Sequence, residues 1–411
     1  MRISTNQIYR RGLDNILEQQ LQVSKYQGQL SSGKKVQSPS DDPIAAAKIS
    51  LMKRRIAATE QLQKNKEGAQ AAVSLEEQVL GNTVNVVQRI RELQVQAGNS
   101  ALSEADRLSI AGEAQTLLNQ LLDLSNSQDS NGYYMFSGGL TGMQSFSKDS
   151  SGQYVYNGDD TQRFQNVTDS MGVALNDAGS DVFMRIRNGN GYFAINATGA
   201  PNTGTGVVSS GGIVNSTPYV PDNYTLQFSL NSSNQLVYMV SGANVGNVIP
   251  PSGNPDDAPL YSDGESISFN GIQFKVSGMP NPGDDFLITP ARNESVFSTV
   301  ERMINNLKQP VTTPANKAAI ETENNQILEQ LDSSMDNLLA FQAQTGTRLN
   351  QLSIVEKLND DLLLVSNTTL DGLENADLNE TAVNLNLQLI FLQAAQQSFA
   401  RIQGLTVFNY L

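Results

Sequence analysis

Two apolar seven-residue repeats, one near each end of the chain, most constrain how these 411 residues can fold. Near the N-terminus the repeat consists of Tyr9, Ile16, Val23 and Leu30, with Leu13 beside it. Near the C-terminus it consists of Leu378, Leu385, Leu392 and Phe399, flanked by Leu389 and Ile402. Such a seam is buried only when a second helix packs against it. We therefore expect the two ends to pair, so that the chain leaves along a helical rod and returns along it.

The middle of the chain has a different composition. Residues 138–290 contain 21 of the 32 glycines and 10 of the 14 prolines. Alternating apolar stretches occur at Tyr154–Tyr156, Tyr224–Phe228, Leu236–Val240, Ile267–Phe269 and Ile272–Val276. The pair Asn270-Gly271 between the last two is a strong hairpin signal. This pattern predicts a β-rich insert with short strands and two long loops, at 199–221 and 242–259.

The flanks of this insert carry helical signals. Asp41, Asp42 and Pro43 predict the start of a helix that runs to about Gly98. Before the insert, further signals predict a helix cap at Ser103 and an end of the helical part at Asn131-Gly132. After the insert, they predict a cap at Asn293 and a helix start near Pro314. A break near Asp371-Gly372 and a capping box at Asp377–Glu380 then predict the start of the last helix. The expected order is three helices, the β insert and three more helices.

These patterns predict an α+β fold, a long helical coiled-coil or bundle rod with an inserted β-rich tip. We expect three domains: a terminal coiled coil of residues 1–42 and 376–411, a helical bundle of residues 43–137 and 291–375, and an outer β-rich domain of residues 138–290. An insert whose two ends enter one bundle is expected to project from it.

The composition of the chain argues against several classes of function. The chain has no Cys and no His, which removes thiol chemistry and the commonest general base and metal ligand. Its net charge of −14 argues against a nucleic-acid or anionic-membrane surface. There is no run of 18 apolar residues and no basic segment followed by an apolar stretch, so we expect neither a membrane span nor a cleaved signal peptide. We predict a protein that is not an enzyme, with no catalytic residue, cofactor or metal.

Five adjacent acidic pairs could instead suggest an enzyme: Asp41-Asp42, Asp159-Asp160, Asp256-Asp257, Asp284-Asp285 and Asp360-Asp361. Glycoside hydrolysis needs two carboxylates that face each other across a cleft, whereas neighbours in sequence point in different directions. Asn157–Asp160 lacks the spacing of a calcium-binding loop, and Gly189–Gly191 lacks that of a phosphate-binding loop. We interpret these residues as turns, caps and solvated faces.

Several motifs at the two ends resemble the flagellin superfamily. They are Leu30–Val36, Ser40–Ala45, Arg89–Asn99 and Gly346–Leu349. Within that superfamily the start Met1–Thr5, the stretch Tyr133–Gly138 and the ending Leu405–Leu411 resemble the hook-associated protein 3 group, which forms the hook–filament junction. The likeness covers about the first 140 and last 120 residues.

The resemblance implies a structural component of the bacterial flagellum that links the hook to the filament. It implies export through the flagellar type III apparatus with a chaperone, self-association in a helical ring, hook-associated protein 1 on one face and flagellin on the other. From the terminal seams we predict the assembly residues Tyr9, Leu13, Ile16, Val23, Leu30, Leu385, Leu389, Leu392, Phe399 and Ile402. The bend residues would be Asp41, Asp42 and Pro43. A flagellin filament subunit and a secreted rod-like adhesin or binding module are the alternatives.

Overall fold

The computed structural model describes residues 5–99, 101–197, 201–214 and 219–404. They form two compact units. The first contains the chain up to Lys66, Val167–Asp169 and the chain from Ser353 onward. The second contains Glu67–Asn166 and Ser170–Leu352. The predicted α+β class and the order of helices and β insert are confirmed.

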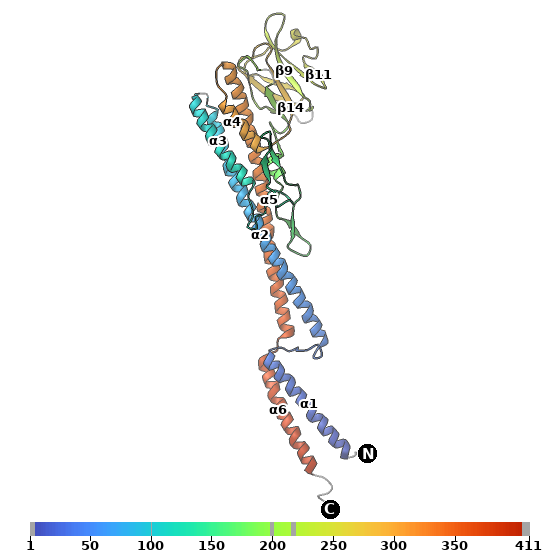
Figure 1. Cartoon of the computed structure of the whole chain (residues 1–411). Coiled ribbons are helices and arrows are strands. Elements are labelled where there is room, and N and C mark those ends of the chain that lie inside the picture. The colour runs from blue at the N-terminus through green and yellow to red at the C-terminus, as the bar shows by residue number, and fades with distance from the viewer. Residues whose placement is uncertain (1–4, 100, 198–200, 215–218, 405–411) are drawn as a thin grey trace, which may run out of the picture. The chain divides into compact units, whose positions relative to one another are not determined.

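In the first unit, helices α1 (Thr5–Ser32) and α6 (Leu378–Gly404) lie side by side (Figure 1). Helix α1 ends at Gly33, whose φ of +69° lies in the left-handed region that favours glycine. The Gly33 N–H donates to the Gln29 carbonyl at 2.8 Å. The N–H of Ala376, just before α6, then donates to the Gly33 carbonyl at 2.9 Å. The two terminal helices are therefore tied together at the point where both leave the pair.

The long helices α2 (Pro43–Ala97) and α5 (Pro314–Glu374) run antiparallel. In the first unit Lys66 pairs with Glu356 at 3.0 Å, and Lys53 pairs with Glu374 at 2.9 Å. In the second unit Gln94 donates to the Asn324 side chain at 3.0 Å. The break predicted near Asp371-Gly372 follows Glu374, the last residue of α5, whose backbone and side chain bind the segment that follows α1.

Two shorter helices complete the helical part of the second unit: α3 (Glu104–Ser125) and α4 (Val296–Lys308). Ser103 caps α3 in a reciprocal capping box with Asp106, as predicted for the start of this helix. Helix α3 ends at Ser125, earlier than the expected Asn131-Gly132. The cap of α4 is Ser295 and not Asn293, because Asn293 pairs with Arg187 in a two-stranded sheet and the helix begins after it.

One core joins these helices to the first part of the β-rich region. The strands here are short: β1 (Phe146–Lys148), β2 (Tyr154–Tyr156), β3 (Phe164–Asn166), β4 (Gly172–Ala174), β5 (Ile186–Arg187) and β15 (Asn293–Glu294). Phe136, Phe146 and Phe183 are fully buried beside Phe297 of α4, and the rings of Phe146 and Phe297 are 5.2 Å apart. The buried residues Phe136, Phe146, Tyr154, Val182, Phe183 and Ile186 thus belong to the helical core.

The remaining strands form two antiparallel sheets that enclose a second core. One sheet has the order β11 (Gly246–Ile249), β10 (Leu236–Gly242), β9 (Tyr224–Leu230), β14 (Asp285–Pro290) and β6 (Phe193–Ala197). The other contains β12 (Ser266–Phe269), β13 (Ile272–Ser277), β7 (Val207–Val208) and β8 (Gly212–Ile213). The predicted hairpin turn is confirmed, with Asn270 and Gly271 at φ 44° and 78°.

The two long loops expected at 199–221 and 242–259 contain some regular secondary structure. Strands β7 and β8 lie within 199–221, and β11 and a 3-10 turn at Pro255–Asp257 lie within 242–259. These strands are two to four residues long and add to the edges of sheets. Strand β11 forms because it pairs with β10. Its own four residues do not specify that pairing, so the strand could not be predicted from them.

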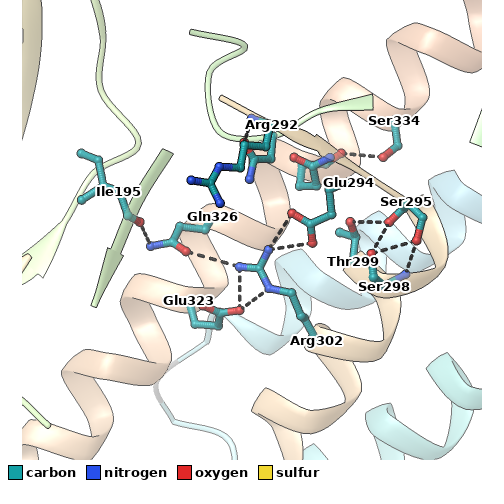
Figure 2. A network of polar contacts seen from close by, with 12 residues as sticks. Ile195, Arg292, Glu294, Ser295, Ser298, Thr299, Arg302, Glu323, Gln326 and Ser334 are labelled. Carbon is teal, nitrogen blue, oxygen red and sulfur yellow. Dashed lines mark hydrogen bonds and ion pairs between the residues drawn. The ribbon is translucent and has the colours of Figure 1, made fainter. Parts of the chain in front are cut away.

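A polar network centred on Arg302 of α4 links this sandwich to the helices (Figure 2). Arg302 donates to both carboxylate oxygens of Glu294, at 2.9 and 3.1 Å, and to Glu323 of α5 at 2.9 Å. It also donates to the Gln326 side-chain oxygen at 3.3 Å, and Gln326 donates to the Ile195 carbonyl of β6. One guanidinium therefore connects α4, α5 and a strand of the sandwich.

A second charged cluster lies in the helical core, and its two acidic residues, Glu76 and Asp177, are fully buried. Glu76 of α2 accepts a hydrogen bond from the Asp177 N–H at 2.8 Å, and Arg348 of α5 lies 2.5 Å from the Asp177 carboxylate. Arg348 is 3.5 Å from Glu76, so two carboxyl groups share one cation. Burial, and then the negative charge of Asp177, raise the pKa of Glu76 to about 8.

Candidate assembly interface

The predicted seam residues of the two terminal helices face each other. Tyr9 of α1 and Phe399 of α6 meet edge to face, with ring centroids 6.1 Å apart. Gly12 also lies against this ring, since a Cβ atom there would be 2.7 Å from it. Ile16, Val23, Leu385 and Leu392 are half-buried in the same pair. Ile402 is in the last turn of α6, but its side chain lies outside the described residues, as do Met1–Ser4 and Leu405–Leu411.

None of the seam side chains that the structure describes is fully buried. Four residues of the predicted repeats and their flanks are exposed: Leu13, Leu30, Leu378 and Leu389. Other large apolar side chains of this pair are more than 40% exposed: Leu17, Leu21, Val383, Leu387, Ile390 and Phe391. Two helices can cover only one stripe of each other, and here apolar residues occupy more than one stripe. Many large apolar side chains on the outside of one helix pair are typical of surfaces that bind another protein.

Helices α2 and α5 of the first unit also carry exposed apolar side chains, which are not among the assembly residues predicted from the sequence. Ile44 and Leu51 of α2 are exposed, and so are Ile354, Leu358, Leu364 and Val365 of α5. The run Leu362-Leu363-Leu364-Val365 was the available signal, because four consecutive apolar residues cannot all face one partner helix.

The predicted bend residues have distinct roles at the start of α2. The Asp42 carboxylate accepts from the N–H groups of Ile44 and Ala45 at 3.0 and 2.9 Å, so it caps the helix that begins at Pro43. Asp41 instead accepts from the N–H groups of Gln37 and Ser38, at 3.1 and 2.8 Å. These hydrogen bonds, led by that from the Ser38 backbone, lower the pKa of Asp41. The two carboxylates thus shape the connection between α1 and α2.

Three of the other acidic pairs are also used locally. Asp159 accepts from the Gly139 N–H at 2.6 Å, and Asp160 forms an ion pair with Arg185 at 2.5 Å. Asp256 accepts from the Ser232 N–H at 2.6 Å, and Asp284 from the N–H groups of Thr203 and Gly204. These carboxylates stabilise turns, as interpreted from the sequence. Within the described ranges, no three acidic side chains gather as a metal site, and no helix has the length and apolarity to cross a membrane.

Comparison with known proteins identifies the chain. The profile of the bacterial flagellin N-terminal helical region matches residues 3–141. The flagellar hook-associated protein 3 of Salmonella typhimurium is 26% identical over 409 residues, covering 100% of this chain and 99% of that protein.

Solved structures agree with this similarity. The crystal structure of flagellar hook associated protein-3 from Legionella pneumophila has a TM-score of 0.78 and 57% identity, and covers 79% of this chain and 98% of that one. The Xanthomonas campestris FlgL structure has a TM-score of 0.71 and 30% identity, covering 78% of this chain and 99% of that one. With the paired terminal helices and the inserted β sandwich, these similarities show that the chain belongs to the flagellar hook-associated protein 3 family, the structural junction proteins of the bacterial flagellum.

Proposed function

We propose that this protein assembles as a ring of subunits at the hook–filament junction, with α1 and α6 as the main interface. The observation that carries the proposal is the exposed apolar surface of this helix pair, which includes Leu21 at 70% and Ile390 at 59% exposure. Covering one such side chain contributes roughly 1 to 2 kcal/mol. Several of them on one short helix pair favour burial by neighbouring subunits.

The two faces of the ring would bind different proteins, hook-associated protein 1 on the hook side and flagellin on the filament side. Before export, a chaperone would cover the same apolar helices and prevent premature association. We expect export through the flagellar type III apparatus. We expect no catalytic activity, no nucleic-acid binding and no membrane insertion, consistent with the net charge of −14 and the local use of the acidic pairs.

Immunogold electron microscopy of detached flagella tests the location. With an antibody against residues 138–290, gold should gather at one spot between hook and filament. Gold along the whole filament would instead indicate a flagellin. Gold absent from flagella would favour a secreted adhesin and overturn the proposal.

A substitution in α6 tests the interface. Leu392→Asp should leave the isolated protein folded but prevent its incorporation into flagella, because Leu392 is half-buried in the terminal pair and outside both main cores. Circular dichroism and motility measure the two effects, and Gln393→Asp, at an exposed neighbouring position, is the control. A large loss of helix in the isolated Leu392→Asp protein would show that this residue belongs to ordinary core.

A further inference from the structure

The first unit has an open cavity of about 520 Å³ where the segment after α1 passes over the first turns of α2. Its apolar lining comes from Val36, Pro39, Ile49 and Ala57. Its charged lining comes from Lys34, Lys53, Arg54 and Glu374. We call it the basic cavity.

The charges in this cavity are only partly balanced. Glu374 forms ion pairs with Lys34 at 2.6 Å and Lys53 at 2.9 Å, and both lysines lower the pKa of this carboxylate through their hydrogen bonds. Arg54 is exposed and forms no ion pair with any residue that the structure describes. An occupant of the cavity would therefore need an apolar side chain next to a negative charge.

The same unit carries a surface with that chemistry. Ile354, Leu358, Asp361 and Val365 are exposed on one face of α5, at spacings of four, three and four residues. The opposite face of this helix holds the buried Leu352, Val355 and Asn359. We call the exposed face the α5 ridge. Asp361 lies in its middle, and no ion pair is found for it in the described part of the chain.

The distribution of charge along the chain favours the same contact. Residues 1–66 contain twelve Lys and Arg but five Asp and Glu, whereas residues 353–411 contain two and seven. The segment that supplies most of the cavity is therefore cationic, and the segment that supplies the ridge is anionic. Opposite charges on two separate surfaces of one chain steer copies of that chain toward each other.

We propose that the basic cavity of one copy receives the α5 ridge of the next copy, with Arg54 facing Asp361 across the contact. The contact joins two different surfaces, so it is head-to-tail and extends into a ring or helix instead of closing as a dimer. It rests on the proposed function, in that it identifies a second contact by which the subunits of the junction associate.

A charge swap in the full-length chain tests this contact. Arg54→Glu and Asp361→Arg should each reduce the amount of protein retained in detached flagella by about tenfold, since each puts like charges in contact. The chain that carries both substitutions should return to within about twofold of the wild type, because every contact then pairs Glu at 54 with Arg at 361. Arg55→Glu makes the same charge change at an exposed position outside the cavity lining and should have little effect.

The amount secreted into the medium and the circular dichroism of each variant show that export and folding are intact. Normal incorporation of both single variants into flagella would overturn the contact. It would also be overturned if the double variant were retained in no greater amount than the single variants, which is the result expected if the ridge or the cavity binds a different protein. Either result leaves the junction role standing when the wild type is found at the junction. Absence of the wild type from flagella would instead refute the proposed function.

Discussion

The buried carboxyl of Glu76 should make the stability of the second unit fall as pH rises through neutrality. In the unfolded chain this group titrates near its ordinary pKa of 4.5, whereas in the folded protein burial and Asp177 raise it to about 8. Between these values the folded state holds a proton that the unfolded state has lost. The free energy of unfolding therefore decreases with pH in this window, and below it both states are protonated.

The two pKa values set the magnitude. Each unit of difference corresponds to about 1.4 kcal/mol, so ionisation of Glu76 would cost roughly 3 to 4 kcal/mol between pH 5 and pH 8. Glu76→Gln removes this cost, because its amide oxygen can still accept the hydrogen bond from the Asp177 N–H. Glu374 and Asp160 do not interfere in this window, since their pKa values are lowered and the stability they contribute is lost only at more acidic pH.

The assay is hydrogen exchange in a urea series, read on peptides that span residues 172–184. Wild type and Glu76→Gln are compared at the same pH, so that the pH dependence of the intrinsic exchange rate cancels from the comparison. The variant should gain stability relative to the wild type by roughly 3 to 4 kcal/mol from pH 5 to pH 8. Glu67→Gln, at an exposed position of the same helix, is the matched control. A difference between Glu76→Gln and wild type that stays constant with pH would refute the raised pKa.

The contacts between the sandwich and the helices lead to two further predictions. Arg302→Met should lower the free energy of unfolding by about 2 kcal/mol, because Glu294 and Glu323 lose their shared cation, while Arg292→Met, at an exposed position, should have an effect below about 0.5 kcal/mol. Urea unfolding measures both, and equal effects would contradict the role of the Arg302 network. Residues 193–290 should be replaceable by a short Gly-Ser linker with retention of junction assembly, since the Ala291 N–H already donates to the Tyr192 carbonyl at 2.8 Å. Immunogold labelling of an epitope tag and circular dichroism test this deletion, and a folded, exported protein that fails to reach the junction would argue against it.

Features that depend on a few neighbouring residues could be predicted from the sequence. The capping box of Ser103 with Asp106, the turn at Asn270-Gly271 and the helix start at Pro43 all depend on backbone hydrogen bonds within four residues or on conformations that the side chain itself favours. The terminal repeats likewise indicated helices and a shared seam, because a period of seven residues places Ile16 and Val23 on one face. The family likeness rests on the same local motifs.

Features that depend on contacts between distant residues required the tertiary structure. The run Leu362–Val365 does not itself say which of its residues are covered, and only the packing of α5 leaves Leu364 and Val365 exposed while Leu362 and Leu363 are half-buried. Glu76 looks like any helix-surface glutamate until Asp177 and Arg348, 101 and 272 residues away, surround it. The basic cavity depends on the same kind of pairing, since Glu374 forms ion pairs with Lys34 and Lys53, balances only part of their charge and leaves Arg54 without an ion pair among the described residues. Periodicity and capping are local in the chain, whereas burial and charge neutralisation are set by which distant segments pack together.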